Sequence, residues 1–190
     1  MPVTEIVLTV ISSSILLIPI FIVMYLLHFW DRKAVGVYFL FSLYLCVIYR
    51  LTGLPDITYF HWDPDVALIP FVSMIGDLRS TALNVLLFLP LGIGLPLLWK
   101  RYEGLWETVL FGLLISLGIE TAQLFTYRAT DINDLITNVS GTLLGYFTYK
   151  GFIPKKFARK EDDAPILLGI CCTVMFFGEP IVHGILYRLL

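Results

Sequence analysis

Six long stretches with almost no charged residues constrain the fold of this chain more than any other feature. They cover residues 6–30, 34–49, 80–99, 108–127, 135–149 and 164–187, and the fifth can begin a turn earlier, at Ile132. A helix needs about 20 mostly apolar residues to cross the hydrocarbon core of a bilayer. Charged residues make up only 15% of the chain, against roughly a quarter in a soluble domain. We therefore expect an all-α, polytopic membrane helical bundle of about six transmembrane helices, formed as a single domain by residues 1–190.

The overall composition excludes two other classes of protein. Disorder requires low hydrophobicity and high charge, whereas 58% of these residues are hydrophobic. A net charge of −2 argues against a nucleic-acid-binding protein, which is normally basic. We expect membrane lipids as partners and no nucleic acid.

The Lys and Arg residues between the spans predict how the chain is oriented, because cytoplasmic loops are enriched in these residues. With both termini extracytoplasmic, nine of the thirteen face the cytoplasm and four face outward. The nine inner residues are Arg32, Lys33, Lys100, Arg101, Lys150, Lys155, Lys156, Arg159 and Lys160. The four outer residues are Arg50, Arg79, Arg128 and Arg188. The opposite orientation inverts this ratio, so we predict that the N-terminus and the C-terminus are both extracytoplasmic.

The longest outer connection, residues 50–79, carries aromatic and apolar residues. Residues 59–62 read Tyr-Phe-His-Trp and residues 68–71 read Leu-Ile-Pro-Phe. Such aromatic residues are typical of the belt at a membrane interface. A re-entrant segment shielded by protein is the alternative.

Glu120 is the most informative residue in the chain, because ionisable side chains inside a span are costly and normally face protein or water. It is the only acidic residue in the span 108–127. On a helix it shares one face with Gly112, Ser116 and Gln123. Small residues on that face allow a neighbouring helix to pack closely.

The next span carries a matching face. Asp131, Asp134, Asn138, Gly141 and Gly145 recur at helical spacing. Because the connection between the two spans is short, we expect these two faces to pack against each other. Capping the first turn of the helix is the alternative role of the two aspartates.

Polar residues of other spans lie at a similar predicted depth. With a rise of 1.5 Å per residue, Asn84 lies near the outer end of its span, and Glu179 and His183 lie near the outer end of the last span. Together with Glu120 and Asn138 they predict one polar pocket that opens to the outside. An intrahelical pair without further chemistry is the alternative for Glu179 and His183.

Two arginines are predicted to border this pocket. The planar guanidinium groups of Arg128 and Arg79 are suited to binding phosphate or carboxylate. Ion pairing is the alternative: Arg128 with an aspartate of the following helix, or Arg79 with Asp77.

Three motifs in the middle of the chain resemble those of the VanZ-like family. They are NVLLFLPLGIGLPLL at 84–98, SLGIETAQLFTYRATDINDLITNVSGTLLGY at 116–146 and LIPF at 68–71. The second contains the ordered polar set of Glu120, Gln123, Arg128, Asp131, Asp134 and Asn138. The resemblance is closest over 68–146, and one departure is Asn133, which stands where many relatives carry an acid.

The resemblance implies a multi-pass protein of the bacterial cell membrane. Members of the family are associated with reduced susceptibility to teicoplanin and other lipid-tailed glycopeptides, without a settled biochemical activity. The expected function is therefore to bind or remodel an envelope lipid or a lipid-tailed molecule. Its expected partners are membrane lipids, a lipid-linked cell-wall precursor or a lipoglycopeptide. We expect binding by Asn84, Gln123, Arg128, Asp131, Asp134, Asn138 and Arg79, with Glu179 and His183 as secondary candidates.

Two alternatives compete with this expectation. The first is an intramembrane enzyme acting on a lipid-linked envelope substrate, with Glu120 as its acid/base residue. Asp131 and Asp134 are then the candidate ligands of a divalent cation such as Mg²⁺, although no cofactor is required by the sequence. The second is a transporter, which normally places polar groups near the midplane of the bilayer. The inner halves of these spans are almost purely apolar, which disfavours transport.

Overall fold

A computed structural model describes residues 3–27, 32–58, 60–62, 65–71, 76–126, 128–152 and 163–189. The chain divides into two compact units, one formed by residues 1–60 and 165–190 and the other by residues 61–164. We refer to them as unit 1 and unit 2. The predicted inner residues Lys155, Lys156, Arg159 and Lys160 lie outside the described residues.

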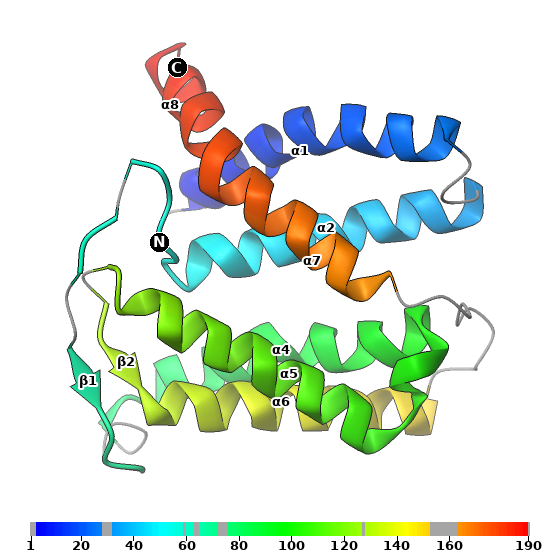
Figure 1. Cartoon of the computed structure of the whole chain (residues 1–190). Coiled ribbons are helices and arrows are strands. Elements are labelled where there is room, and N and C mark those ends of the chain that lie inside the picture. The colour runs from blue at the N-terminus through cyan, green and yellow to red at the C-terminus, as the bar shows by residue number, and fades with distance from the viewer. Residues whose placement is uncertain are drawn as a thin grey trace. The chain divides into compact units, whose positions relative to one another are not determined.

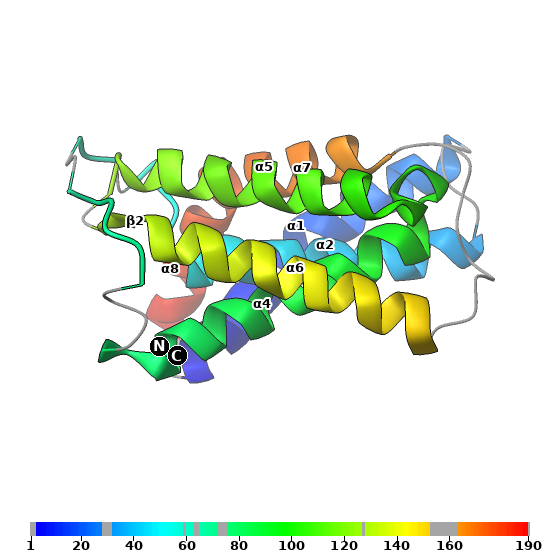
Figure 2. The ribbon, with the colours of Figure 1, turned by 90° about the horizontal axis from the view of Figure 1, so that it is seen from below.

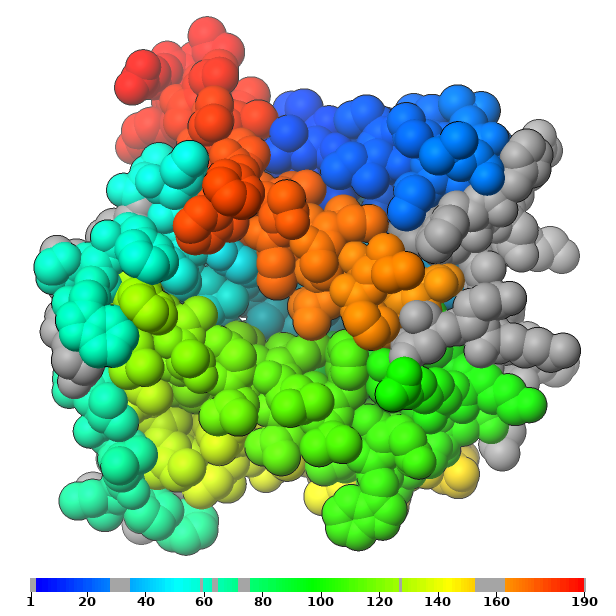
Figure 3. Space-filling view, viewed as in Figure 1, coloured from blue at the N-terminus to red at the C-terminus, as the bar shows by residue number. Residues whose placement is uncertain are grey.

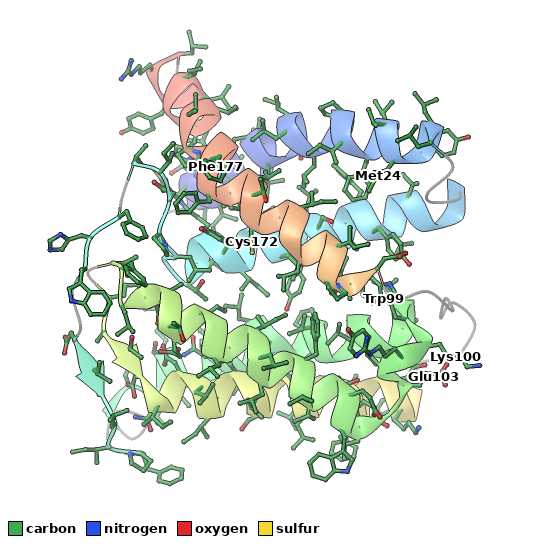
Figure 4. All side chains as sticks on the ribbon, viewed as in Figure 1. Met24, Trp99, Lys100, Glu103, Cys172 and Phe177 are labelled. Atoms are coloured by element: carbon green, nitrogen blue, oxygen red, sulfur yellow. The ribbon has the colours of Figure 1, made fainter. Side chains whose placement is uncertain are left out.

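Unit 2 is built from three long helices, α4 (Leu78–Leu98), α5 (Leu105–Gln123) and α6 (Ile132–Phe152). Figures 1 and 2 show the three helices running side by side. A short 3₁₀ helix, η1 (Lys100–Glu103), joins α4 to α5, and Figure 4 labels Lys100 and Glu103 at this connection. Trp99 precedes η1 and is fully buried, with its ring 6.4 Å from that of Tyr102. This aromatic pair anchors one end of the unit.

Glycines set the close approach between α4 and α6. A Cβ atom added to Gly141 would collide with the backbone carbonyl of Val85, and one added to Gly145 with that of Leu89. On the other helix, a Cβ atom at Gly92 would collide with the carbonyl of Thr142. The backbones of α4 and α6 are therefore in direct contact, as small residues allow in membrane helices.

The small residues of α5 do not pack against the α6 glycines that contact α4. A Cβ atom at Gly112 would lie 2.6 Å from Oγ1 of Thr142. The predicted packing of the α5 and α6 faces is thus correct near Gly112 and Ser116, but Gly141 and Gly145 pack on α4. The reason is that α6 has two packed sides, which its helical periodicity alone does not assign to particular neighbours.

The long connection before α4 packs on unit 2 at the end opposite η1. Its residues Val66–Ala67 form β1, which pairs in parallel with β2, Thr130–Asp131. The amide of Thr130 also donates to the carbonyl of Asp65 at 2.8 Å. At this end of the unit the connection and the start of α6 are therefore fixed together, as Figure 1 shows.

Unit 1 contains α1 (Val3–Leu26), α2 (Arg32–Leu51) and a long composite helix made of α7 (Ala164–Thr173), a π-helical segment η2 (Val174–Gly178) and α8 (Glu179–Leu189). Helices α1 and α2 run side by side in opposite directions (Figure 1). The rings of Phe21 on α1 and Phe39 on α2 meet edge to face at 5.6 Å. An apolar cavity of about 310 Å³ lies beside this pair, lined from both helices.

The π-helical segment has an identifiable cause in Pro180. A proline has no N–H to donate and its ring crowds the carbonyl four residues earlier, which here belongs to Phe176. That carbonyl accepts instead from the amide of Ile57 at 2.9 Å. Within the helix, the amide of Glu179 donates to the carbonyl of Val174, five residues before it. The bulge presents Phe177, labelled in Figure 4, at the surface, where its side chain is 54% exposed.

The expected all-α membrane bundle is confirmed, with six helices in the described residues when the composite helix is counted as one. Four of them are long and apolar enough to cross a membrane: Val3–Leu26, Leu78–Leu98, Leu105–Gln123 and Ala164–Leu189. A shorter apolar helix covers Val35–Leu51. The extracytoplasmic position of both termini stays a prediction.

The glycine contacts generate a stability prediction. The substitution Gly145→Ala places a methyl group against the α4 backbone, which cannot move aside as a side chain can. We expect a loss of about 1–3 kcal/mol in unfolding free energy, the usual range for overpacking. The measurement is unfolding of the purified protein in detergent, followed by circular dichroism.

The matched control is Gly118→Ala on α5, where an added Cβ atom meets nothing within 4 Å. This variant is expected to unfold like the wild type. Equal stabilities of the two variants would contradict direct backbone contact between α4 and α6.

Candidate functional site

A polar cluster lies where α5 ends and α6 begins, at the end of unit 2 that carries β1 and β2. Seven residues from three helices and the connection between α5 and α6 form it. They are Asn84, Ser116, Glu120, Asp131, Asn133, Asp134 and Asn138, and we call them the unit 2 polar cluster. The sequence analysis placed five of these residues on helical faces and Asn84 near the outer end of its span, and hydrogen bonds connect them in the structure.

Glu120 joins α5 to the start of α6. Its Oε2 accepts from the amide of Asp131 at 2.9 Å, and its backbone carbonyl accepts from Oγ1 of Thr130 at 2.9 Å. The residue is only 5% exposed. Its second oxygen, Oε1, is buried and has no hydrogen-bonding partner among the residues that the structure describes. One oxygen of this carboxyl group therefore has a structural role, and the other is an acceptor without a described hydrogen-bond donor.

Asp134 and Asn138 attach α6 to its two neighbours. Asn84 of α4 donates from Nδ2 to Oδ1 of Asp134 at 2.7 Å. One turn further along, Nδ2 of Asn138 donates to Oγ of Ser116 at 3.0 Å. Asn138 is 3% exposed, and its Oδ1 is a second buried acceptor without a hydrogen-bonding partner among the described residues. Both available acceptors therefore lie along the interface between α5 and α6.

Asp131 caps α6, which is the alternative role considered for it from the sequence. Its Oδ1 accepts from the amide of Asn133 at 2.8 Å, two residues into the helix. A carboxylate in this position satisfies a free amide and complements the helix dipole. Asp134 lies in the same turn, but its side chain accepts from Asn84 on α4, so it serves packing between helices as well.

Asn133 is the residue whose role the sequence analysis missed. It is 3% exposed, and its Oδ1 accepts from the amide of Phe71 at 2.6 Å. Its Nδ2 donates to Asp131 Oδ1 at 2.7 Å and to the carbonyl of Ile69 at 3.2 Å. The position between two aspartates was visible in the sequence, but no local signal connects it with a segment more than sixty residues away.

Through these bonds Asn133 fixes the segment 68–71 beside the cluster. Phe71 has a positive φ of 69°, a conformation that costs a non-glycine residue energy and needs support from its surroundings. Leu68 and Ile69 are both 69% exposed and Phe71 is 59% exposed. This segment therefore presents three large apolar side chains at the surface, in the teal region of Figure 3.

The remaining predicted residues of unit 2 occupy the rim or the interior. Arg128 is exposed and acts electrostatically on the carboxyl groups of both Glu120 and Asp134. Arg79 is exposed in the first turn of α4, next to Asp77, which caps that helix by accepting from the amide of Ser80 at 3.0 Å. Gln123 is buried, with 2% exposure, at the end of α5.

Glu179 and His183 belong to unit 1, where they have polar partners of their own. His183 Nδ1 lies 3.1 Å from Glu179 Oε1, as expected for an intrahelical pair at this spacing. Ser12 of α1 donates to the same oxygen at 3.0 Å. That these residues share one pocket with the unit 2 polar cluster stays a prediction.

The chemistry that unit 2 offers is that of carboxylates, amides and a guanidinium. Among the described residues there is no group of three or more His, Cys, Asp or Glu side chains arranged to hold a metal ion. The cluster therefore consists of hydrogen-bond acceptors and donors at a helix interface, with a cation at its edge.

The comparisons with known proteins match this region of the chain. The family model described as VanZ/LLP1 covers residues 41–154, which include the whole unit 2 polar cluster. The chain belongs to the VanZ/LLP1 family. Protein VanZ of Enterococcus faecium is 36% identical over 110 residues. That match spans 57% of this chain and 66% of the relative, slightly less than two thirds of its length. No solved structure is similar to the chain.

Membership of the VanZ/LLP1 family confirms the resemblance seen in the sequence. It also separates the two polar groups of the chain. The unit 2 polar cluster lies inside the matched region, whereas Glu5, Glu179 and His183 lie outside it. The polar residues of unit 1 thus need an explanation of their own.

The contacts of Asn133 generate a second prediction. The substitution Asn133→Ala removes the acceptor for Phe71 and the donor for Ile69, so the segment 68–71 is expected to open more often. Amide hydrogen exchange of this segment, measured by mass spectrometry, should become faster, because exchange reports local opening.

Ser140→Ala on the same helix is the control, because among the described residues the Ser140 hydroxyl donates to the carbonyl of Ile136 in its own helix. It should leave exchange in the segment unchanged. Unaltered exchange in Asn133→Ala would mean that β1 and its neighbours hold the segment without this side chain.

Proposed function

We propose that the unit 2 polar cluster binds the headgroup of an envelope lipid or of a lipid-tailed molecule. The protein does so as a multi-pass protein of the bacterial cell membrane, with the cluster on the outer side. By binding or remodelling such a molecule it lowers susceptibility to teicoplanin-type lipoglycopeptides. Membership of the VanZ/LLP1 family supports a role of this general kind.

The observation that carries the proposal is the pair of buried acceptor oxygens. Glu120 Oε1 and Asn138 Oδ1 have no partner among the described residues, and a buried polar atom without a partner costs about 1–3 kcal/mol. A ligand that donates hydrogen bonds removes this cost for both atoms. Sugar hydroxyls and peptide amides are such donors, and both occur in lipid-linked cell-wall precursors and in lipoglycopeptides.

The edge of the cluster suits the other parts of such a ligand. Arg128 offers a guanidinium beside the two carboxyl groups, and this group pairs well with phosphate or carboxylate. The exposed side chains of Leu68, Ile69 and Phe71 offer an apolar contact for a lipid tail. The polar cluster thus suits the headgroup of such a molecule, and the apolar side chains beside it suit the tail.

The outer face of α5 suits contact with bilayer lipid. Beyond the exposed Glu107 in its first turn, the large exposed side chains of this helix are apolar: Trp106, Leu110, Leu113, Leu114 and Leu117. Helix α5 forms part of the surface in Figure 3. A lipid held at the cluster would therefore have its chains beside a face suited to contact with acyl chains.

The test is binding of a fluorescent lipid-tailed glycopeptide to live bacteria that express the protein. Cells with the wild type, Glu120→Gln or Arg128→Ala are compared at matched membrane levels, and a tail-less glycopeptide shows whether the tail is needed. The matched control is Glu107→Gln, which changes an exposed glutamate in the first turn of the same helix. Wild type and control are expected to alter binding of the tailed compound alone.

Glu120→Gln is expected to reduce this effect partly, because the amide keeps an acceptor oxygen but loses the charge. Arg128→Ala should weaken it where the ligand is anionic. Complete loss of the effect in Glu120→Gln would instead favour the enzymatic alternative, with Glu120 as acid/base. If the wild type does not change binding at all, the proposed ligand class is wrong.

A further inference from the structure

A second set of connected polar residues lies in unit 1, separate from the unit 2 polar cluster. It joins Glu5 and Ser12 of α1, Arg50 of α2, and Glu179 and His183 of α8. Four of the five, all except Arg50, lie in helices that the family model does not cover. We call these five residues the unit 1 chain, because they are connected in a linear order.

The order of the unit 1 chain follows from its distances. Arg50 Nη2 lies 3.5 Å from Glu5 Oε2, and the same oxygen lies 3.4 Å from His183 Nε2. The other ring nitrogen, Nδ1, lies 3.1 Å from Glu179 Oε1, which also accepts from Ser12 Oγ at 3.0 Å. His183 thus has a carboxyl group at each of its two nitrogens.

Along the unit 1 chain, the exposure of the side chains decreases from Arg50 to Glu179. The side chains of Arg50 and Glu5 are 29% and 24% exposed, that of His183 is 12% exposed and that of Glu179 is 1% exposed. The chain therefore leads from partly accessible groups to a carboxyl group enclosed by helices. An ionisable side chain buried inside a membrane helix is costly, and where one occurs it commonly belongs to a functional path.

The backbone places Glu179 at the inner end of this path. It is the first residue of α8, directly after the π-helical segment η2. Segments of this kind inside α-helices are frequent at functional sites. On α1, Glu5 and Ser12 are two helical turns apart, and on α8, Glu179 and His183 are one turn apart. Glu5 contacts His183 and Ser12 contacts Glu179, so the two helix faces meet in antiparallel order.

We propose that the unit 1 chain is a proton-transfer path, in which Glu5 delivers protons through His183 to the buried carboxyl group of Glu179. A histidine between two carboxyl groups is suited to this role, because imidazole can accept a proton at one nitrogen and donate one from the other. The ligand of the site is the proton, and Glu179 is its buried acceptor.

The transfer balances without any other reactant. The carboxylic acid of Glu5 gives its proton from Oε2 to Nε2 of neutral His183. At the same time Nδ1–H of His183 gives its proton to Oε1 of the Glu179 carboxylate. Glu5 is left as a carboxylate, His183 as the other neutral tautomer and Glu179 as a carboxylic acid. The reverse transfer restores the starting state, and no group is oxidised or reduced.

The charged groups around the path fit a gain and loss of one proton. Glu5 of α1, Arg50 of α2, and His183 and Glu179 of α8 are the titratable or charged groups in contact with one another in the chain. Arg50 remains charged and stabilises the carboxylate of Glu5 after transfer. Ser12 donates to Glu179 Oε1, which stabilises the carboxylate before transfer.

The experiment is time-resolved infrared spectroscopy of the full-length protein in lipid nanodiscs after a jump from about pH 8 to about pH 5, the range in which histidine changes charge. The wild type should develop a carboxylic-acid signal that is absent in Glu179→Gln. In His183→Asn the same signal should appear about a hundredfold more slowly, the order of effect expected for a positioned proton carrier.

Glu107→Gln, on α5 of unit 2, is the control and should respond like the wild type. A structural ion-pair network would leave the rate of the Glu179 signal unchanged in His183→Asn, and this result would overturn the proposal. The proposal would also be overturned if Glu179→Gln showed the same carboxylic-acid signal as the wild type.

A second measurement does not depend on how these variants fold. His28→Asn and His61→Asn together leave His183 as the only histidine, and nitrogen NMR then reports its protonation. Both ring nitrogens should respond to the pH change in this otherwise intact chain. A ring that keeps one tautomer at all pH values would exclude transfer through His183.

Discussion

The direct contact between the backbones of α4 and α6 is the constraint on which unit 2 depends. Gly92, Gly141 and Gly145 leave no room for a side chain at this contact. Because the helices approach so closely, Asn84 of α4 reaches Asp134 of α6 at 2.7 Å. The neighbouring side of α6 contacts α5, through Ser116 and Asn138. Van der Waals contact between small residues thus positions the polar groups, as expected where lipid removes the hydrophobic driving force between helices.

The two oxygens of the buried Glu120 side chain differ in their surroundings. One of its oxygens holds the start of α6 through the amide of Asp131, and the other is buried and has no partner among the described residues. A purely structural role needs only the first oxygen. The second, together with Asn138 Oδ1, is the observation on which the proposed binding of a hydrogen-bond donor rests.

Unit 1 also contains a buried carboxyl group, that of Glu179, beside an irregular part of a helix. Pro180 removes one helical hydrogen bond, and the released carbonyl of Phe176 is satisfied by Ile57. The resulting π-helical segment precedes Glu179, whose carboxyl group is then surrounded by Ser12 and His183. In both units a buried carboxyl group lies near a point where regular helix ends or changes.

The sequence by itself determined the membrane bundle, the positions of its helices, the family and most residues of the polar cluster, because hydrophobic runs and helical periodicity are local properties of the chain. It also predicted the pair of Glu179 and His183 from their spacing. Only the tertiary structure decided that Gly141 and Gly145 pack on α4, that Asn133 holds residues 69–71, and that Glu5 and Arg50 join His183. These contacts connect residues far apart in sequence, and periodicity shows which face of a helix is special but not which neighbour that face meets.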